Sequence, residues 1–165
     1  SNIESGLITL EKESIQFNDL LQEQVKFHRE TAEAKQIHLH FDPSPNLPPV
    51  QANQQNMEEV VSNLVTNAIN YTPEGGDIRL SLCIENAYLR IDVADTGWGI
   101  PPEDLERVFT RFYRVKNDKT RYITGTGLGL PIIRSIIEAH HGTIQVKSTL
   151  DKGSVFSVYI PHVTP

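Results

Sequence analysis

The sequence contains little that would suit a secreted, membrane-spanning or nucleic-acid-binding protein. Its 165 residues include a single cysteine, Cys83, which excludes an intrachain disulfide and a zinc site built from cysteines. No apolar run reaches the roughly 20 residues that a membrane-spanning helix needs, and no signal peptide is visible. The net charge of −6 argues against general nucleic-acid binding. These absences predict a soluble, cytoplasmic domain, although a longer parent chain could still carry a membrane anchor.

The composition is otherwise that of an ordinary globular domain. Hydrophobic residues make up 38% and charged residues 22% of the chain, which is long enough to bury one sizeable core. Cys83 lies in an alternating apolar and polar run, so we expect a buried thiol on a strand rather than a nucleophile.

The positive charge is concentrated in one segment between two glycine-rich stretches. Residues 107–121 contain six basic side chains and one acidic one, whereas the remainder contains nine basic and 20 acidic residues. Glycines before this segment, in residues 95–100, and after it, in 125–130, allow backbone N–H groups to approach a phosphate closely. The pattern predicts a nucleotide site with a basic lid.

Hydrophobic periodicity predicts three helices and five to seven strands. The helices are expected from Asn18 or Asp19, as the N-cap, to about Lys35, over residues 54–71 and over residues 127–141. The strands are expected at residues 7–16, 37–41, 78–84, 89–93, 143–148 and 154–160, with a proline-rich loop at 42–49.

The order of these elements favours an α+β fold. Strands and helices do not alternate strictly, so we expect a two-layer sandwich in which a mixed, mostly antiparallel sheet of about five strands packs against three helices. No strand directly precedes Gly125, which argues against a dinucleotide-binding Rossmann fold.

Three histidines do not suggest a metal site. His38 and His40 share one face of a predicted strand, but no third ligand is near in the sequence, so a solvated face is expected. His28 is predicted to be a surface residue of the first helix, whose apolar positions are Leu20, Leu21, Val25, Phe27 and Ala34.

The second helix has an unusual polar face. Its apolar residues cluster on one side and are Met57, Val60, Val61, Leu64, Val65, Ala68 and Ile69. The opposite side carries Glu59, Asn63, Asn67 and Asn70, with Tyr71 near its border. Asparagine has mediocre helix propensity, but its carbonyl oxygen can bind Mg²⁺ without cancelling the charge of the ion. Asn67, with Asn63 one turn before it, is therefore a candidate Mg²⁺ ligand.

Asp95 follows a predicted strand and precedes two glycines. Its carboxylate could accept a hydrogen bond from an exocyclic amine and so select adenine over guanine. Asp95-Thr96-Gly97 also matches the aspartic-protease triplet, but that interpretation needs a second acidic partner in an all-β fold, and the chain offers neither.

Four motifs in order resemble those of sensor histidine kinases over roughly residues 10–161. Asn63–Tyr71 is similar to the N box, Asp95–Ile100 to the G1 box, Phe109–Arg114 to the F box and Gly125–Leu130 to the G2 box. The resemblance implies the ATP-binding sandwich that these kinases share with DNA gyrase, the heat-shock chaperone ATPases and the mismatch-repair ATPases.

The resemblance implies a role for each matching residue. Asn67 would be the principal Mg²⁺ ligand with Asn63 assisting at the metal or the phosphates, and Tyr71 would pack along the adenine or ribose. Asp95 would bind the adenine amino group. The other implied nucleotide contacts are Asn70, Gly97, Gly99, Ile100, Gly125, Thr126, Gly127, Leu128 and Gly129. Phe109 and Phe112 would anchor the lid, and Arg114 would reach the γ-phosphate.

The chain departs from the family pattern at several positions. Asn70 stands where Lys is common, which removes a phosphate contact, Thr96 stands where Asn is frequent, and Thr124 stands where a further Gly is frequent. Asn63 occupies the position where the gyrase-like ATPases carry a water-activating Glu. Without that base, the site should favour phosphoryl transfer over hydrolysis.

The phosphoacceptor motif of these kinases, a His followed by an acid, is absent from the sequence. The chain is therefore expected to be the catalytic domain alone, residues 7–165, preceded at 1–6 by the end of a dimerisation helix or a linker. Its expected partners are the histidine-bearing dimerisation domain and a response regulator receiver domain, and the isolated domain is expected to be monomeric. The alternatives are a nucleotide-sensing module with little transfer activity and a serine-kinase anti-sigma relative.

Overall fold

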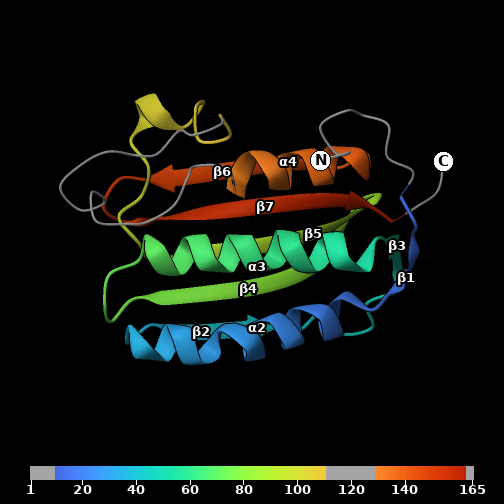
Figure 1. The fold of residues 1–165 in the computed structure, drawn as a ribbon, viewed down its shortest axis with the longest axis horizontal. Coiled ribbons are helices and arrows are strands. Elements are labelled where there is room, and N and C mark those ends of the chain that lie inside the picture. The colour runs from blue at the N-terminus through green and yellow to red at the C-terminus, as the bar shows by residue number, and fades with distance from the viewer. Residues whose placement is uncertain (1–9, 111–128, 163–165) are drawn as a thin grey trace.

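The computed structural model describes residues 10–110 and 129–162 (Figure 1). The α-helices are α2 (Phe17–Ala34), α3 (Gln54–Asn70) and α4 (Gly129–Ala139), and a short 3₁₀ turn, η1, covers Pro102–Asp104. The strands are β1 (Glu13–Ile15), β2 (His38–Asp42), β3 (Val50–Ala52), β4 (Asp77–Glu85), β5 (Tyr88–Asp95), β6 (Thr143–Thr149) and β7 (Gly153–Pro161). None of the helices in this described part of the chain is long and apolar enough to cross a membrane.

The main sheet has five strands in the order β2-β4-β5-β7-β6. The β2–β4 pair is parallel and the other three pairs are antiparallel, while β1 and β3 form a separate antiparallel pair. Asp95 at the end of β5 lies opposite Ile78 of β4 and opposite Ser154 of β7. The mixed, mostly antiparallel sheet predicted from the sequence is confirmed.

The three helices cover one face of this sheet, with α3 between α2 and α4 (Figure 1). Every apolar residue predicted for the inner face of α3 is buried, because the helix presents that stripe to the strands and to both neighbouring helices. The sheet contributes alternate apolar side chains such as Leu80, Ile91 and Val158, each of which is fully enclosed. The two-layer α+β sandwich is confirmed.

The start of α2 differs from the prediction. The helix begins at Phe17, and the side chain of Gln16 caps it by accepting a hydrogen bond from the backbone N–H of Asn18. Asn18 is inside the helix, and its amide group exchanges two hydrogen bonds with the backbone of Ser44 at 2.7 and 2.9 Å. Asn18 therefore fixes the proline-rich loop to α2 rather than capping the helix.

The prediction that His28 lies on the surface is wrong. This side chain is buried, and its Nε2 lies 2.8 Å from the Oγ atom of Ser62 on α3. Phe27, beside it, is 75% exposed although it is apolar. The inward-facing stripe of α2 thus passes through the histidine rather than the phenylalanine.

The prediction of a buried thiol is also wrong, because Cys83 is exposed. The alternation along β4 places Ile78, Leu80 and Leu82 beneath the helices and therefore turns Cys83 to the opposite face of the sheet. In the described structure all three α-helices lie on the other side, so the thiol has no helix to cover it (Figure 1).

Candidate functional site

Asp95 lies at the point where β5 ends beside β7. Its Oδ1 accepts hydrogen bonds from the backbone N–H groups of Gly97 at 2.9 Å and Ser154 at 3.2 Å. No described residue donates a hydrogen bond to Oδ2. Burial raises the pKa of Asp95 to about 6, although the two backbone hydrogen bonds act in the opposite direction. The site therefore offers one carboxylate oxygen as an acceptor in a weakly solvated position.

Residues 95–100, from the end of β5 onward, form the Asp95 loop. Its Thr96 accepts a hydrogen bond from the N–H of Asp77 at 2.9 Å through Oγ1 and returns one from its own N–H to the carbonyl of Asp77 at 3.0 Å. The N–H of Trp98 donates to the carbonyl oxygen of Tyr71 at 3.1 Å. The loop is thus attached to the start of β4 and to the end of α3.

Two glycines of this loop are required by close approaches of the backbone. A Cβ atom at Gly97 would overlap the carbonyl oxygen of Tyr71. Gly99 has a φ of +74°, in the left-handed region that favours glycine, and a Cβ atom there would overlap the carbonyl oxygen of Thr149. Both glycines predicted for the nucleotide site therefore have structural reasons to be glycine, whatever their contact with a ligand.

The polar face of α3 leads away from this loop. The Nδ2 group of Asn63 donates to the carbonyl oxygen of Glu59 at 2.9 Å, which leaves the Oδ1 atom of Asn63 free to accept. A Cβ atom built on Gly129, the first residue of α4, would lie 3.9 Å from that Oδ1. Asn67 makes no side-chain hydrogen bond with any described residue. Asn63 and Gly129, which the sequence places 66 positions apart, are therefore neighbours.

These amides suit a cation that takes few protein ligands. Mg²⁺ usually binds one or two protein oxygens and completes its coordination with phosphates and water. The oxygens of Asn63 and Asn67 meet that requirement. The part of the chain that the structure describes contains no group of three or more His, Cys, Asp or Glu side chains suited to a metal ion.

Phe109 is half-buried at the edge of the core. Its ring packs edge to face on Phe156 with ring centroids 6.4 Å apart, and the Arg134 guanidinium lies 5.7 Å from its centroid. These contacts fit the predicted role of Phe109 as an anchor. Phe112, Arg114, Gly125, Thr126, Gly127 and Leu128 lie outside the described residues.

The remaining predicted residues lie at the end of α3 and in the Asp95 loop. Asn70 is the last residue of α3 and Tyr71 is its C-cap, directly beneath the loop. The backbone N–H of Ile100 donates to the Oγ atom of Ser148 at 2.7 Å, which fixes the far end of the loop to β6.

Sequence patterns did not identify two serines that hold this site. Ser154 donates its N–H to Asp95, and its hydroxyl lies 2.7 Å from the hydroxyl of Ser148. The one sequence signal is Gly153, where a Cβ atom would overlap the carbonyl oxygen of Asp95. A glycine in a hairpin turn is too common to have indicated this contact.

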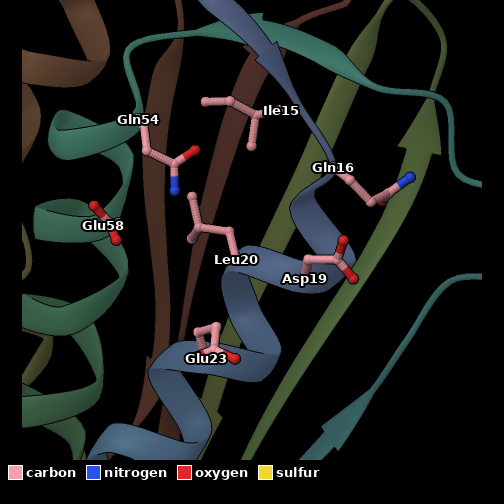
Figure 2. Close-up of a pocket in the computed structure, with 7 residues that line it drawn as sticks. All are labelled: Ile15, Gln16, Asp19, Leu20, Glu23, Gln54 and Glu58. Atoms are coloured by element: carbon pink, nitrogen blue, oxygen red, sulfur yellow. The ribbon is translucent and has the colours of Figure 1, made fainter.

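A cavity of about 260 Å³ lies elsewhere, at the start of α2 and α3 (Figure 2). Asp19, Glu23 and Glu58 surround it, and Ile15 and Leu20 supply apolar surface. A helix of 17 residues is about 25 Å long, so this cavity and the Asp95 loop lie at opposite ends of α3. The carboxylates in Figure 2 would repel an anionic nucleotide, so the Asp95 loop is the better candidate site.

A protein-family model matches most of this chain. Residues 52–164 match the model of the histidine kinase-, DNA gyrase B- and HSP90-like ATPases. The chain belongs to this family. The match contains α3, the Asp95 loop and α4, which are the elements that carry the candidate site.

Individual relatives of this ATPase-family domain are sensor histidine kinases. The sensor histidine kinase RppB of Synechocystis sp. is 40% identical over 144 residues, which cover 87% of this chain and 32% of RppB. The sensor histidine kinase WalK of Bacillus subtilis is 41% identical over 115 residues, or 68% of this chain and 19% of WalK. The domain thus spans about a third or less of these relatives.

Solved structures of histidine kinases have the same fold. The catalytic domain of histidine kinase ThkA superposes with a TM-score of 0.82 at 31% identity, covering 94% of this chain and all of that domain. Full-length ShkA in complex with AMPPNP gives a TM-score of 0.84 at 28% identity, covering 96% of this chain and 32% of ShkA. ThkA in complex with the response regulator TrrA gives a TM-score of 0.78 at 29% identity, covering 93% of this chain and 42% of that ThkA chain. The recognition of a histidine kinase catalytic domain from four sequence motifs is confirmed.

Proposed function

We propose that this catalytic domain binds Mg-ATP and transfers the γ-phosphoryl group to a histidine on the dimerisation domain of a parent sensor kinase. The observation that carries the proposal is the arrangement around Asp95. Two backbone N–H groups hold Oδ1, and no described residue donates to Oδ2. That oxygen is therefore available to a ligand.

Adenine is the base that suits this carboxylate. The exocyclic amine of adenine can donate a hydrogen bond to Oδ2, whereas guanine presents a carbonyl oxygen at the equivalent position and would be repelled. Because the pKa of Asp95 is about 6, its carboxylate is mostly ionised at neutral pH and acts purely as an acceptor. Gly97 and Gly99 allow the Asp95 loop to fold closely against α3 and β6, which holds the carboxylate in place.

The polar face of α3 is suited to the other end of the nucleotide. Asn67 and Asn63 would hold Mg²⁺ through their side-chain oxygens, and Gly129 beside Asn63 would bring the start of α4 close to the phosphates. Bound Mg²⁺ would neutralise negative charge on the phosphates. The proposed roles of Arg114 and of the G2 box at residues 125–129 rest on the family resemblance.

The amide side chain of Asn63, in place of a carboxylate, favours phosphoryl transfer over hydrolysis of ATP. Asn63 cannot take a proton from water, because a neutral amide is a very weak base. Glu59 is one turn earlier on α3, where its backbone carbonyl accepts the Asn63 hydrogen bond. We therefore propose that the nucleophile comes from another domain.

The partners belong to the same proposal. ThkA forms a complex with a response regulator and ShkA binds AMPPNP, and this chain is similar to both. By analogy, residues 1–6 would lead from a histidine-bearing dimerisation helix into a catalytic domain at 7–165, and the phosphohistidine would supply a receiver domain. Such a domain would work in the cytoplasm and would be monomeric in isolation.

Nucleotide binding can be measured by calorimetry on the 165-residue chain. We expect Mg-ATP to bind, and we expect Asp95→Ala and Asn67→Ala each to abolish the binding. Asp92→Asn is the matched control, since Asp92 lies on the same strand but faces Arg90 on the uncovered side of the sheet. Undiminished binding in both the Asp95 and Asn67 variants would overturn the assignment of the site.

Phosphoryl transfer needs a second measurement. The chain is mixed with a separate histidine-bearing dimerisation domain and γ-labelled ATP, and acid-labile phosphohistidine is expected. Asn70, in place of the common Lys, favours the alternative of a nucleotide-sensing module with little transfer activity. ATP binding without any phosphohistidine would support that alternative.

A further inference from the structure

Lys35 is a basic residue that lies outside the four motifs. It contacts the end of α3, the helix that carries the N box. It is the C-cap residue of α2, and its ammonium group reaches across to α3. There Nζ donates to the backbone carbonyl oxygens of Ile69 at 2.7 Å and Asn70 at 3.3 Å.

The end of α3 needs such a partner. The last carbonyl groups of a helix lack donors within the helix, and the helix dipole places partial negative charge there. The last turn of α3 contains no basic residue of its own. Lys35 supplies the cation from a different helix, 34 residues earlier in the chain than Ile69.

The same ammonium group also contacts the Asp95 loop. It lies 5.8 Å from the centroid of the Trp98 ring, within the range of a cation–π interaction. The backbone N–H of Trp98 in turn donates to the carbonyl oxygen of Tyr71, directly after α3. One side chain thus touches both the helix that presents the asparagines and the loop that presents Asp95.

We propose that Lys35 is a positioning residue that fixes the Asp95 loop relative to the end of α3, and so sets the distance between the base-binding and metal-binding parts of the site. The role assigned to Lys35 requires no contact with the nucleotide. The proposal rests on the proposed function, because it assigns Lys35 to the ATP site described above. An ordinary helix cap would stabilise α3 without any effect of its own on the loop.

The chain offers a direct spectroscopic test, because Trp98 is its only tryptophan. Lys35→Met keeps most of the aliphatic stem and removes the charge, and Lys35→Arg retains a cation that can both donate to carbonyls and stack on the ring. Lys26→Met is the control, since Lys26 is exposed on the same helix. For each variant we would record the Trp98 emission spectrum without nucleotide, the affinity for Mg-ATP and the thermal midpoint.

We expect Lys35→Met to shift the Trp98 emission and to weaken Mg-ATP binding about tenfold while the domain remains folded. Lys35→Arg should restore both properties, and Lys26→Met should alter neither. In a double-mutant cycle with Trp98→Leu, the losses of affinity should be less than additive, because each change breaks the same contact.

The outcomes separate this inference from the proposed function. If wild type binds Mg-ATP and Lys35→Met binds it equally tightly with unchanged emission, then Lys35 is only a helix cap and the inference is wrong, while the proposed function stands. If Lys35→Met lowers the thermal midpoint but leaves the affinity for Mg-ATP unchanged, Lys35 is likewise only a helix cap and the inference is wrong. If wild type does not bind Mg-ATP, the proposed function fails and the assigned role of Lys35 fails with it.

Discussion

Among individual residues, Asp95 is in an environment that opposes its charge. Its Oδ1 is satisfied by two backbone N–H groups, yet burial outweighs them and raises the pKa of the carboxyl to about 6 from 3.8. A carboxyl that binds its proton more tightly when folded makes the fold less stable as the pH rises from about 4 through 6. Above pH 6 the native state carries the full cost of this ionised group.

Asp95→Asn should therefore separate stability from binding. The amide oxygen can still accept from Gly97 and Ser154, so we expect the free energy of unfolding at pH 7.5 to increase by roughly 2 kcal/mol. The Nδ2 group would replace Oδ2 and present donors to the adenine amine, so Mg-ATP binding should be lost. Urea unfolding from pH 7.5 to 4 measures the first effect and calorimetry the second.

The pH dependence provides the internal control for that prediction. Near pH 4 the wild-type carboxyl is neutral in the native state and only about half ionised in the unfolded state, so the stabilities of the two proteins should approach one another. A variant that is less stable than wild type at pH 7.5, or one that still binds Mg-ATP normally, would contradict the assigned role of Asp95.

The roles of single residues were only partly accessible from the sequence. Asp95, Gly97 and Gly99 could be chosen because they lie together within a few positions after a strand. Ser154 could not, because its contact with Asp95 depends on the register between β5 and β7, across a sequence separation of 59. The contact between His28 and Ser62, which are 34 positions apart, could not be predicted either. His28, which was predicted to be exposed, is therefore buried against α3.

At the level of secondary-structure elements, periodicity was sufficient for α3 but not for α2, where Phe27 is exposed and His28 is buried. The seven apolar positions of α3 repeat at helical spacing, and all seven are buried as predicted. The first residue of α2 was not predictable in this way. Asn18 is a good candidate cap by residue type, but the backbone of Ser44, 26 positions later, engages its side chain.

Three elements meet at a buried histidine. His140, after α4, is 2% exposed, and its Nε2 accepts a hydrogen bond from the N–H of Asn53 at 3.0 Å. Nε2 must therefore be unprotonated, and Nδ1 carries the hydrogen that is donated to the carbonyl of Ile136 at 2.9 Å. The side chain of Asn53 caps α3 and also donates to the carbonyl of Glu11, ahead of β1. This neutral imidazole thus joins α3, α4 and the segment that leads into β1.

The His140 contact predicts sensitivity to acid. Burial is the main cause that lowers the pKa of His140, with Lys12 and His141 acting in the same direction and the Ile136 hydrogen bond opposing them. A base whose pKa is lower in the folded state contributes stability above pH 6.5 that is lost as the pH falls through the folded value. Wild type should therefore lose stability as the pH falls below 6.5.

The test compares wild type with His140→Gln by urea unfolding from pH 8 to 5. Glutamine cannot titrate, so the difference in stability between the two proteins should shrink as the pH falls. At pH 8 the variant should be less stable by roughly 1 kcal/mol, because it can replace only one of the two ring hydrogen bonds. Burial also lowers the pKa of His28, so His28 also reduces stability as the pH falls. Asp95 has the opposite effect on stability below pH 6, because its pKa is raised. Both contributions are the same in wild type and in His140→Gln, so they cancel in the difference. A difference that is constant with pH would exclude His140 as the titrating group.

Over the whole molecule, the two faces of the sheet differ in their cover and in their polarity. The helix-covered face supplies the core, and the candidate site lies at its edge, where α3 ends against the Asp95 loop. The other face is polar: Arg79 contacts both carboxylate oxygens of Asp42 at 2.9 Å, and Arg90 contacts Asp92 at 3.0 Å and lies over the ring of Tyr159. Cys83 lies on this face, opposite Arg90 in the register of β4 and β5.

This asymmetry predicts that Cys83 can be modified without effect on the nucleotide site. The thiol is exposed, so the native chain should react with one equivalent of a maleimide. Partial burial raises the pKa of Cys83, with Arg90 opposing, so the reaction should be slow near pH 7 and should accelerate as the pH rises. Because the sheet separates Cys83 from the helices, the Trp98 emission and the affinity for Mg-ATP should not change on labelling. A thiol that reacts only after unfolding would contradict its position on the uncovered face, and a labelled protein with weakened Mg-ATP binding would show that this face communicates with the site.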